Sequence, residues 1–328
     1  MIKRILKYFG FLVGGLLVLF LLLIAVAFLT ADHSPVGHWK SDEGMRLFDT
    51  AYNAAMALLP EPANTYDVST DFGTVRVYAW VPENAVGTTP VILAPGRSSG
   101  VPMWYKNLPE IAKTRHVYAF DSLGDSGQSV QTAEIKDMAD QVAWMDQMFN
   151  ELSIQRAHLV GHSFGGLMMA SYASVHPERV ASLALIEPAF TFASLPPETM
   201  LYAMLSTLPL PEKWTEHFMN KISGTDAGEV AADDPVAEMI YAGTKYFSAK
   251  IPAPEQITPE QMRSWPMPVF GAIAENSPIH DPQAALRAAE ENIQNITVRI
   301  WPQATHALPM EFPEEINREL LTFFREND

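Results

Sequence analysis

A regular alternation of short apolar strands with helices is the feature that most constrains the fold of this chain. Between residues 91 and 186, apolar runs of strand length alternate with longer segments whose apolar residues recur at helical spacing. Strands that alternate with helices build a mainly parallel sheet with helices on both faces, so the sequence predicts the α/β class. The predicted strands are 91–94, 117–120, 158–160 and 183–186, and the predicted helices are 104–113, 133–152 and 164–175.

The pattern extends to both sides of this region. Before it, an amphipathic helix is predicted over 41–59, and Asp71-Phe72-Gly73 separates the two strands of a hairpin, 66–69 and 75–81. Near the end of the chain, strands 268–274 and 297–300 alternate with helices 282–292 and 313–325. Together these segments predict a mainly parallel, eight-stranded sheet.

Residues 189–266 interrupt the alternation after the sixth strand. This block is rich in proline and aromatic residues, and it predicts several short helices and no strand. We interpret it as a helical cap inserted over the sheet. Its aromatic side chains and methionines indicate an apolar, adaptable pocket that selects the substrate; the methionines are Met200, Met204, Met219, Met239 and Met262.

The N-terminus has the pattern of a membrane anchor. Lys3, Arg4 and Lys7 precede an uncharged run from Tyr8 to Leu29, and about 20 apolar residues suffice to span a bilayer as a helix. The basic residues predict a cytoplasmic N-terminus and place the rest of this single-pass chain on the non-cytoplasmic side. A cleaved signal peptide is the alternative, because Ala25–Ala27 forms an A-x-A pattern; a buried core helix is a further one.

These features predict five segments along the chain. They are a transmembrane anchor (1–30), a linker with the amphipathic helix (31–64), the first part of a core (65–188), the helical cap (189–266) and the second part of the core (267–328).

Composition excludes several classes of function. The chain has no cysteine, which rules out disulfides, thiolate metal sites and cysteine nucleophiles. Its net charge of −16 disfavours nucleic-acid binding, which needs basic patches. His158 and His162 are four residues apart, but they fall on a strand and a turn rather than on one helical face, so no metal site is predicted. The sequence leaves the oligomeric state open.

The segment Gly161-His162-Ser163-Phe164-Gly165 matches the G-x-S-x-G pattern of a nucleophilic serine. It directly follows a predicted strand and precedes a predicted helix, which is the context this pattern requires. Together with the Asp121–Ser129 loop, it resembles the α/β-hydrolase fold family over residues 65–326. The resemblance implies that Ser163 is the nucleophile of a serine hydrolase that needs no cofactor.

The resemblance also places the base and the oxyanion hole. His306 lies in the loop between the last predicted strand and the last helix, where this family keeps its catalytic histidine. The oxyanion donors are expected to be the backbone amides of Arg97 and Phe164. The chain departs from the family pattern at Pro95, which replaces a histidine before Gly96.

The sequence leaves several candidates for the third catalytic residue, the acid that supports His306. The family usually has an aspartate in the loop after the penultimate strand, and by resemblance Ser277 occupies that position. In some relatives, such as haloalkane dehalogenases, the acid instead follows the strand after the serine helix, and by this resemblance Glu187 at the end of the sixth strand is the favoured acid. A carboxylate buried there also requires a partner, which His306 would provide. Asp281 and Glu275 are the alternatives, although Asp281 before Pro282 also has the pattern of a helix N-cap.

These observations predict a membrane-anchored serine hydrolase of the carboxylesterase type, acting on a small-molecule ester with an apolar acyl group. Two alternatives remain at this stage. One is a hydrolase-fold protein that binds a ligand without turnover, suggested by Ser277 and Pro95. The other keeps the fold but catalyses C–C bond hydrolysis, acyl transfer or perhydrolysis.

Overall fold

The computed structural model describes residues 32–85, 87–208, 210–224 and 234–328. All helices and strands assigned to these residues lie within the unit Val36–Asp328. The predicted anchor, residues 1–30, lies outside the described residues. Within the described ranges, no helix is long and apolar enough to cross a bilayer.

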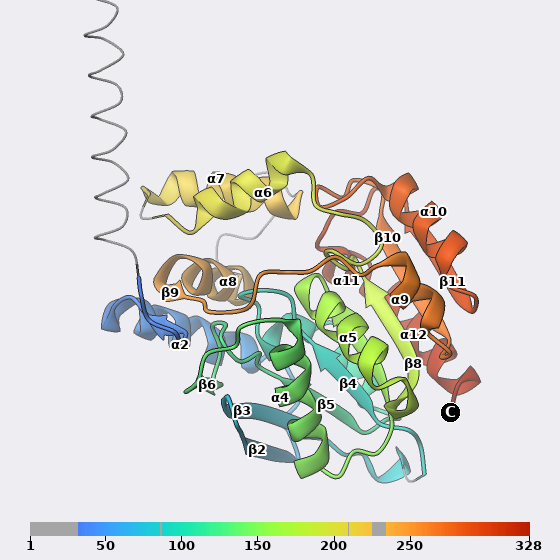
Figure 1. Ribbon diagram of the computed structural model, residues 1–328. Helices are drawn as coiled ribbons and strands as arrows, with labels where there is room; N and C mark the ends of the chain where they lie inside the picture. The colour runs from blue at the N-terminus through green and yellow to red at the C-terminus, as the bar shows by residue number, and fades with distance from the viewer. Residues whose placement is uncertain (1–31, 86, 209, 225–233) are drawn as a thin grey trace, which may run out of the picture. The chain divides into compact units, whose positions relative to one another are not determined.

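The central sheet has the order β11-β10-β8-β7-β4-β5-β3-β2 (Figure 1). The strands from β11 to β5 are parallel, and the hairpin of β2 and β3 is antiparallel at one edge. This confirms the predicted mainly parallel sheet; a short ninth strand, β6, pairs with β3. The strands are β2 (Asn64–Thr70), β3 (Gly73–Trp80), β4 (Val91–Ala94), β5 (Val117–Phe120), β6 (Val130–Gln131), β7 (Ala157–His162), β8 (Val180–Ile186), β10 (Val269–Ala274) and β11 (Ile296–Trp301).

Helices cover both faces of the sheet because side chains along a buried strand alternate between the faces. On β7, Leu159 joins the core under α4 and α5, whereas Val160 joins the core on the opposite face, under α3 and α12. Both side chains are fully buried. The helices are α3 (Leu108–Ile111), α4 (Met138–Glu151), α5 (Phe164–Val175), α10 (Pro282–Asn292), α11 (Leu308–Glu311) and α12 (Pro313–Glu326).

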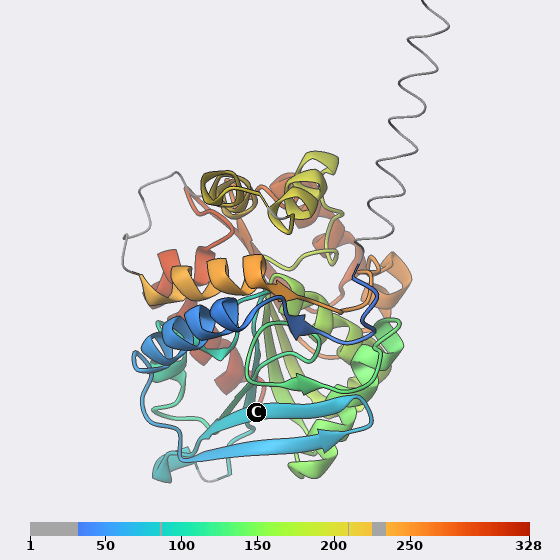
Figure 2. The same cartoon turned by 90° about the vertical axis from the view of Figure 1, so that its left-hand side faces the viewer.

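The amphipathic helix α2 (Asp42–Met56) packs against α8 (Pro235–Tyr246), and the two lie side by side in Figures 1 and 2. The Ser41 side chain caps α2 by accepting a hydrogen bond from the Gly44 amide. A Cβ on Gly44 would lie 2.3 Å from the Tyr246 Cβ, so glycine permits this close approach. Phe48 and Met239 are fully buried between the two helices.

The segment between β8 and β10 forms the predicted cap of short helices. One feature differs from the prediction, because Phe247–Ser248 (β9) pairs antiparallel with His38–Trp39 (β1). The pairing forms where the chain leaving α8 passes the segment before α2, and the rings of Trp39 and Phe247 lie 4.9 Å apart there. The remaining cap helices are α6 (Pro197–Ser206), α7 (Glu212–Ser223) and α9 (Pro259–Ser264).

Candidate active site

Ser163 occupies a strained turn between β7 and α5. Its backbone has φ 54° and ψ −121°, a conformation that costs a non-glycine residue energy. The glycines around it are required by close backbone approach: a Cβ on Gly161 would lie 2.3 Å from the Gly165 carbonyl oxygen, and one on Gly165 would lie 2.4 Å from the Ala94 oxygen. The turn therefore holds the serine at the N-terminal end of α5, where the helix dipole favours negative charge.

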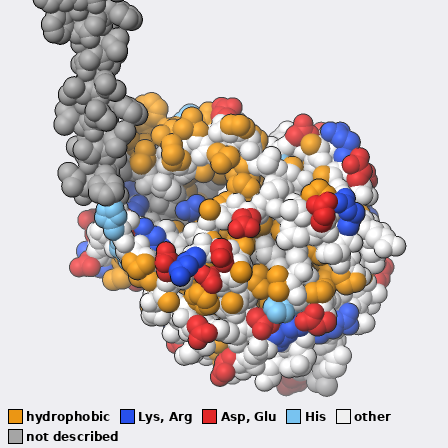
Figure 3. Space-filling model, in the orientation of Figure 1, with side chains coloured by type: hydrophobic (Ala, Val, Ile, Leu, Met, Phe, Trp, Pro, Cys, Tyr) orange, Lys and Arg blue, Asp and Glu red, His pale blue; other side chains and the backbone are white. Residues whose placement is uncertain are grey.

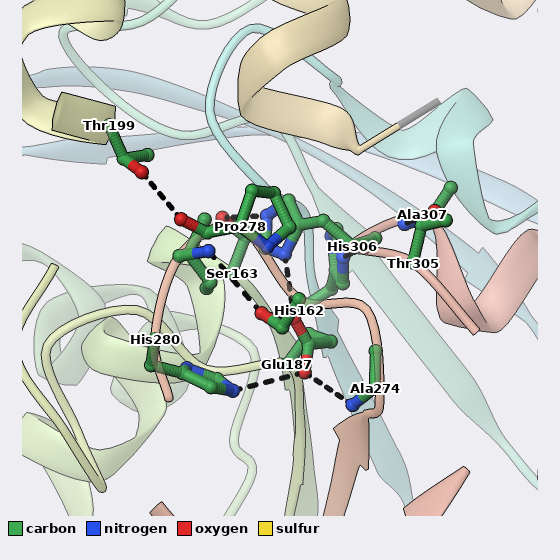
Figure 4. A network of polar contacts seen from close by, with 12 residues as sticks. His162, Ser163, Glu187, Thr199, Ala274, Pro278, His280, Thr305, His306 and Ala307 are labelled. Atoms are coloured by element: carbon green, nitrogen blue, oxygen red, sulfur yellow. Dashed lines mark hydrogen bonds and ion pairs between the residues drawn. The ribbon is translucent and has the colours of Figure 1, made fainter. Parts of the chain in front are cut away.

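His306 contacts this serine from the loop between β11 and α11 (Figure 4). Its Nε2 lies 2.9 Å from Ser163 Oγ, within hydrogen-bonding distance. Its Nδ1 lies 3.2 Å from Glu187 Oε2. A carboxylate can only accept here, so Nδ1 carries the proton and Nε2 is free to accept the proton of Ser163. This is the arrangement in which an imidazole acts as a general base.

Glu187 follows the last residue of β8 and is fully buried. Its φ of 46° is unusual for a residue with a side chain, and its amide donates to the Ala272 carbonyl on β10. Burial opposes ionisation of the carboxyl group. Hydrogen bonds from His280 and His306 outweigh this effect and hold the pKa of Glu187 well below its usual value. The carboxylate beside His306 is therefore ionised at neutral pH.

The carboxylates of the other two candidate acids accept hydrogen bonds from backbone amides away from His306. Asp281 is exposed and caps α10 by accepting a hydrogen bond from the Ala284 amide at 2.8 Å. The Glu275 carboxylate is also exposed and accepts from the Gln303 amide at 2.8 Å. Among the described residues, neither carboxylate bonds to the His306 ring. Glu187 is thus the candidate that the fold brings to the histidine.

The predicted oxyanion loop lies against the serine. A Cβ on Gly96 would come within 3.3 Å of Ser163 Cβ, so the backbone that continues into Arg97 borders the nucleophile. Within the part of the chain that the structure describes, the amides of Arg97 and Phe164 have no hydrogen-bond acceptor. Two free N–H groups beside a nucleophile are what a developing oxyanion requires.

Two buried aspartates hold the oxyanion loop in place. Asp125 accepts a hydrogen bond from the Ser98 amide, and Asp121 accepts one from the Val101 amide, each at 2.8 Å. Asp121 also accepts a hydrogen bond from the Gln128 amide at 2.7 Å, so it fixes backbone amides of two loops. The structure also adds Tyr52 on α2, whose hydroxyl donates to Asp121 at 2.8 Å. Sequence reasoning placed Tyr52 only on the apolar face of a helix, because a contact across 69 residues leaves no local signal.

Sequence reasoning also missed the roles of two histidines. His162 is buried, and its Nε2 donates to the His306 carbonyl oxygen at 2.8 Å. His280, to which no role was assigned, places its Nε2 3.1 Å from Glu187 Oε1. Each contact joins loops more than 90 residues apart in the chain, so residue spacing could not reveal it.

The buried histidines make stability depend on pH. Burial lowers the pKa of His158 to about 4; burial and the charge of His306 lower that of His162 to about 3. An unfolded histidine has a pKa of about 6.5, so the unfolded chain binds protons first and the free energy of unfolding falls as pH drops from about 6.5 toward 4. We expect urea unfolding to show this loss, with a shallower slope for His158→Asn. A free energy that stays constant between pH 7 and 4 would contradict the assignment.

Hydrogen bonds join the cap to two loops of the site, the loop that carries His306 and the loop that carries His280. The Thr199 hydroxyl on α6 donates to the Pro278 carbonyl, and the His306 amide donates to the Ser223 carbonyl at the end of α7, at 3.1 Å. Two of the five cap methionines pack inside the protein rather than lining a pocket. Met239 and Met262 are buried in the cores because α8 and α9 pack directly on the body of the protein.

Comparison with known proteins yields relatives along most of the chain. A family model described as "alpha/beta hydrolase fold" matches residues 89–237. The uncharacterised carboxylesterase nap of Bacillus subtilis (strain 168) is 30% identical over 308 residues, which cover 90% of this chain and 97% of the relative.

Two solved structures of Bacillus subtilis proteins agree with this finding. The carboxylesterase CesB (YbfK) superposes with a TM-score of 0.78 at 28% identity, covering 86% of this chain and 98% of that protein. Naproxen esterase (carboxylesterase NP) has the same TM-score and identity, covering 87% and 99%. With its strained serine turn, its histidine loop and a relative that matches nearly end to end, the chain belongs to the α/β-hydrolase fold family.

Proposed function

We propose that this chain is a serine hydrolase that cleaves carboxylic esters. One observation carries the proposal: Ser163, His306 and the buried Glu187 form a continuous line of contacts, 2.9 Å and 3.2 Å long. The names of the Bacillus relatives as carboxylesterases support the same class of reaction. The members of the line have the roles of nucleophile, base and acid.

The reaction proceeds in two steps. Ser163 Oγ attacks the ester carbonyl while its proton moves to His306 Nε2, and the amides of Arg97 and Phe164 stabilise the oxyanion. His306 then gives the proton to the departing alcohol, which leaves an acyl group on Ser163. Water attacks this acyl group with His306 again as base, releasing the carboxylic acid. Glu187 holds the imidazole in the required tautomer and stabilises its charged form throughout.

An apolar acyl group fits the surface that the cap presents. The α6 and α7 helices carry large apolar side chains that remain exposed, and hydrophobic atoms gather over the same helices in Figure 3. Thr199 and Ser223 join these helices to the catalytic loops, so apolar surface lies on the elements next to the site. Burying apolar surface of a substrate there is favourable; the exposed residues are Met200, Leu201 and Met204 on α6, Trp214 on α7, and Leu208 between the two helices.

The test is pre-steady-state hydrolysis of p-nitrophenyl butyrate and p-nitrophenyl dodecanoate. We expect p-nitrophenol to appear in a burst equal to the enzyme concentration, followed by slower turnover as the acyl-enzyme hydrolyses. The longer ester is expected to have the lower KM. Binding of both esters without release of p-nitrophenol would support a ligand-binding protein instead.

We also propose that residues 1–30 anchor the chain in a membrane and place the catalytic domain on its non-cytoplasmic side. The support is the uncharged run Tyr8–Leu29 behind Lys3, Arg4 and Lys7. In a bacterial host, the full chain is expected to stay with membranes after an alkaline carbonate wash and to be degraded by protease added to spheroplasts. Recovery in the soluble fraction, or protection from the protease, would contradict this proposal.

A further inference from the structure

The Glu187 carboxylate receives four hydrogen bonds, two on each oxygen. Oε1 lies 2.6 Å from the Ala274 amide and 3.1 Å from His280 Nε2. Oε2 lies 2.6 Å from Ser277 Oγ and 3.2 Å from His306 Nδ1. The two imidazoles therefore bind opposite oxygens of one carboxylate (Figure 4).

The His280 side chain has no exposed surface, so it cannot touch a substrate. Its Nδ1 is buried and has no hydrogen-bond partner among the described residues, whereas its Nε2 faces the carboxylate. A proton on Nδ1 would leave a lone pair of Nε2 against a carboxylate oxygen, which is repulsive. The contact therefore requires the Nε2–H tautomer, in which His280 donates to Glu187.

We propose that His280 is a positioning residue for the catalytic acid. This inference rests on the proposed function. The N–H of His280 fixes Oε1, and this fixes the plane of the carboxylate so that Oε2 points at His306 Nδ1. Without this donor, Oε1 keeps only the Ala274 amide, and the carboxylate is held less firmly during the steps in which His306 becomes charged.

The same contact controls the charge that His306 experiences. Among the described residues, the titratable groups that act on Glu187 are His162, His280 and His306, from the serine turn, the loop before α10 and the loop after β11. Removing the His280 donor leaves the negative charge of the carboxylate less compensated by hydrogen bonds. The carboxylate then attracts the His306 proton more strongly. We therefore expect the acid limb of the kcat/KM profile to move to higher pH.

The test compares two substitutions. His280→Leu keeps most of the volume and removes the donor, whereas His280→Gln can place an amide N–H near the position of Nε2. For His280→Leu we expect kcat to fall about 10- to 100-fold, which matches the loss of one hydrogen bond to a charged group, with KM unchanged and the acid limb at higher pH. His280→Gln is expected to restore most of kcat and the original limb. Asp281→Asn, the adjacent residue, serves as the matched control.

Several outcomes decide the question. The proposal is overturned if His280→Leu keeps the wild-type kcat and an unmoved acid limb. It is also overturned if His280→Leu and His280→Gln lose kcat equally while the acid limb stays in place, because that result indicates that His280 only packs. If His280→Leu does not fold, His280→Gln is compared with His280→Asn, whose amide reaches only the position of Nδ1; equal activity of these two would also overturn it. Absence of turnover in the wild type would instead contradict the proposed function.

Discussion

Replacing Ser163 by alanine is expected to lower kcat for p-nitrophenyl butyrate by about 10⁶-fold, to the level left by binding and the oxyanion donors alone. The variant removes the oxygen that is proposed to form the acyl-enzyme, and it leaves the His306 ring without its 2.9 Å contact. Folding is expected to survive, because the strained turn is held by backbone hydrogen bonds, such as those from the Ser163 amide to the Ile186 carbonyl and from the Ala189 amide to the Ser163 carbonyl, rather than by the hydroxyl. Steady-state hydrolysis and thermal unfolding measure the two properties separately.

The matched control is Ser264→Ala, which makes the same chemical change on α9. Ser264 is exposed, and its hydroxyl donates only to the Gln261 carbonyl of its own helix among the described residues. We expect wild-type kcat from this variant. Residual turnover by Ser163→Ala within about tenfold of the wild type would show that another group is the nucleophile.

Glu187→Gln is expected to produce the second-largest effect, a loss of about 10³- to 10⁴-fold in kcat. Glutamine keeps the shape of glutamate but carries no charge, so the imidazolium that forms on His306 loses its stabilising partner. Its amide group also has only one oxygen, whereas the site presents two donors to each carboxylate oxygen. One pair of donors must then face an N–H₂ group, and His306 is driven toward the wrong tautomer.

Asp281→Asn provides the comparison that separates the candidate acids. Asp281 caps α10, and asparagine is an equally good N-cap, so we expect unchanged kcat and a change in free energy of unfolding below about 1 kcal/mol. If Asp281→Asn lost more kcat than Glu187→Gln, the catalytic acid would be Asp281 in the loop before α10. The pair is measured by kcat at saturating ester and by urea unfolding.

The sequence predicted the sheet well because buried parallel strands are continuous apolar runs, as at Val91–Ala94 and Val180–Ile186. Helix ends were predicted less well. The helix predicted over 133–152 begins at Met138, where Asp137 caps it by accepting from the Asp140 amide. The helix predicted over 104–113 is wrong for most of its length: Pro102 and Pro109 divide the region into the 3₁₀ turn Val101–Trp104 and the short α3.

At the site, the sequence identified residues that stand at the ends of strands and missed those that act across loops. Ser163, Glu187 and His306 each follow a parallel strand, and the carboxyl ends of such strands meet at one edge of the sheet. Contacts such as that between His280 and Glu187 depend on how two loops pack, and a local pattern carries no information about packing. The choice between Glu187 and Asp281 therefore needed coordinates.

The central claim is that His306, supported by Glu187, makes the Ser163 hydroxyl reactive. The most direct measurement is the rate at which a fluorophosphonate labels the protein, with the modified residue mapped by mass spectrometry. The account predicts a single adduct on Ser163 in the wild type, labelling slowed at least about 10³-fold by His306→Ala, and none on Ser163→Ala. An adduct on another residue, or equal labelling rates for the wild type and His306→Ala, would contradict it.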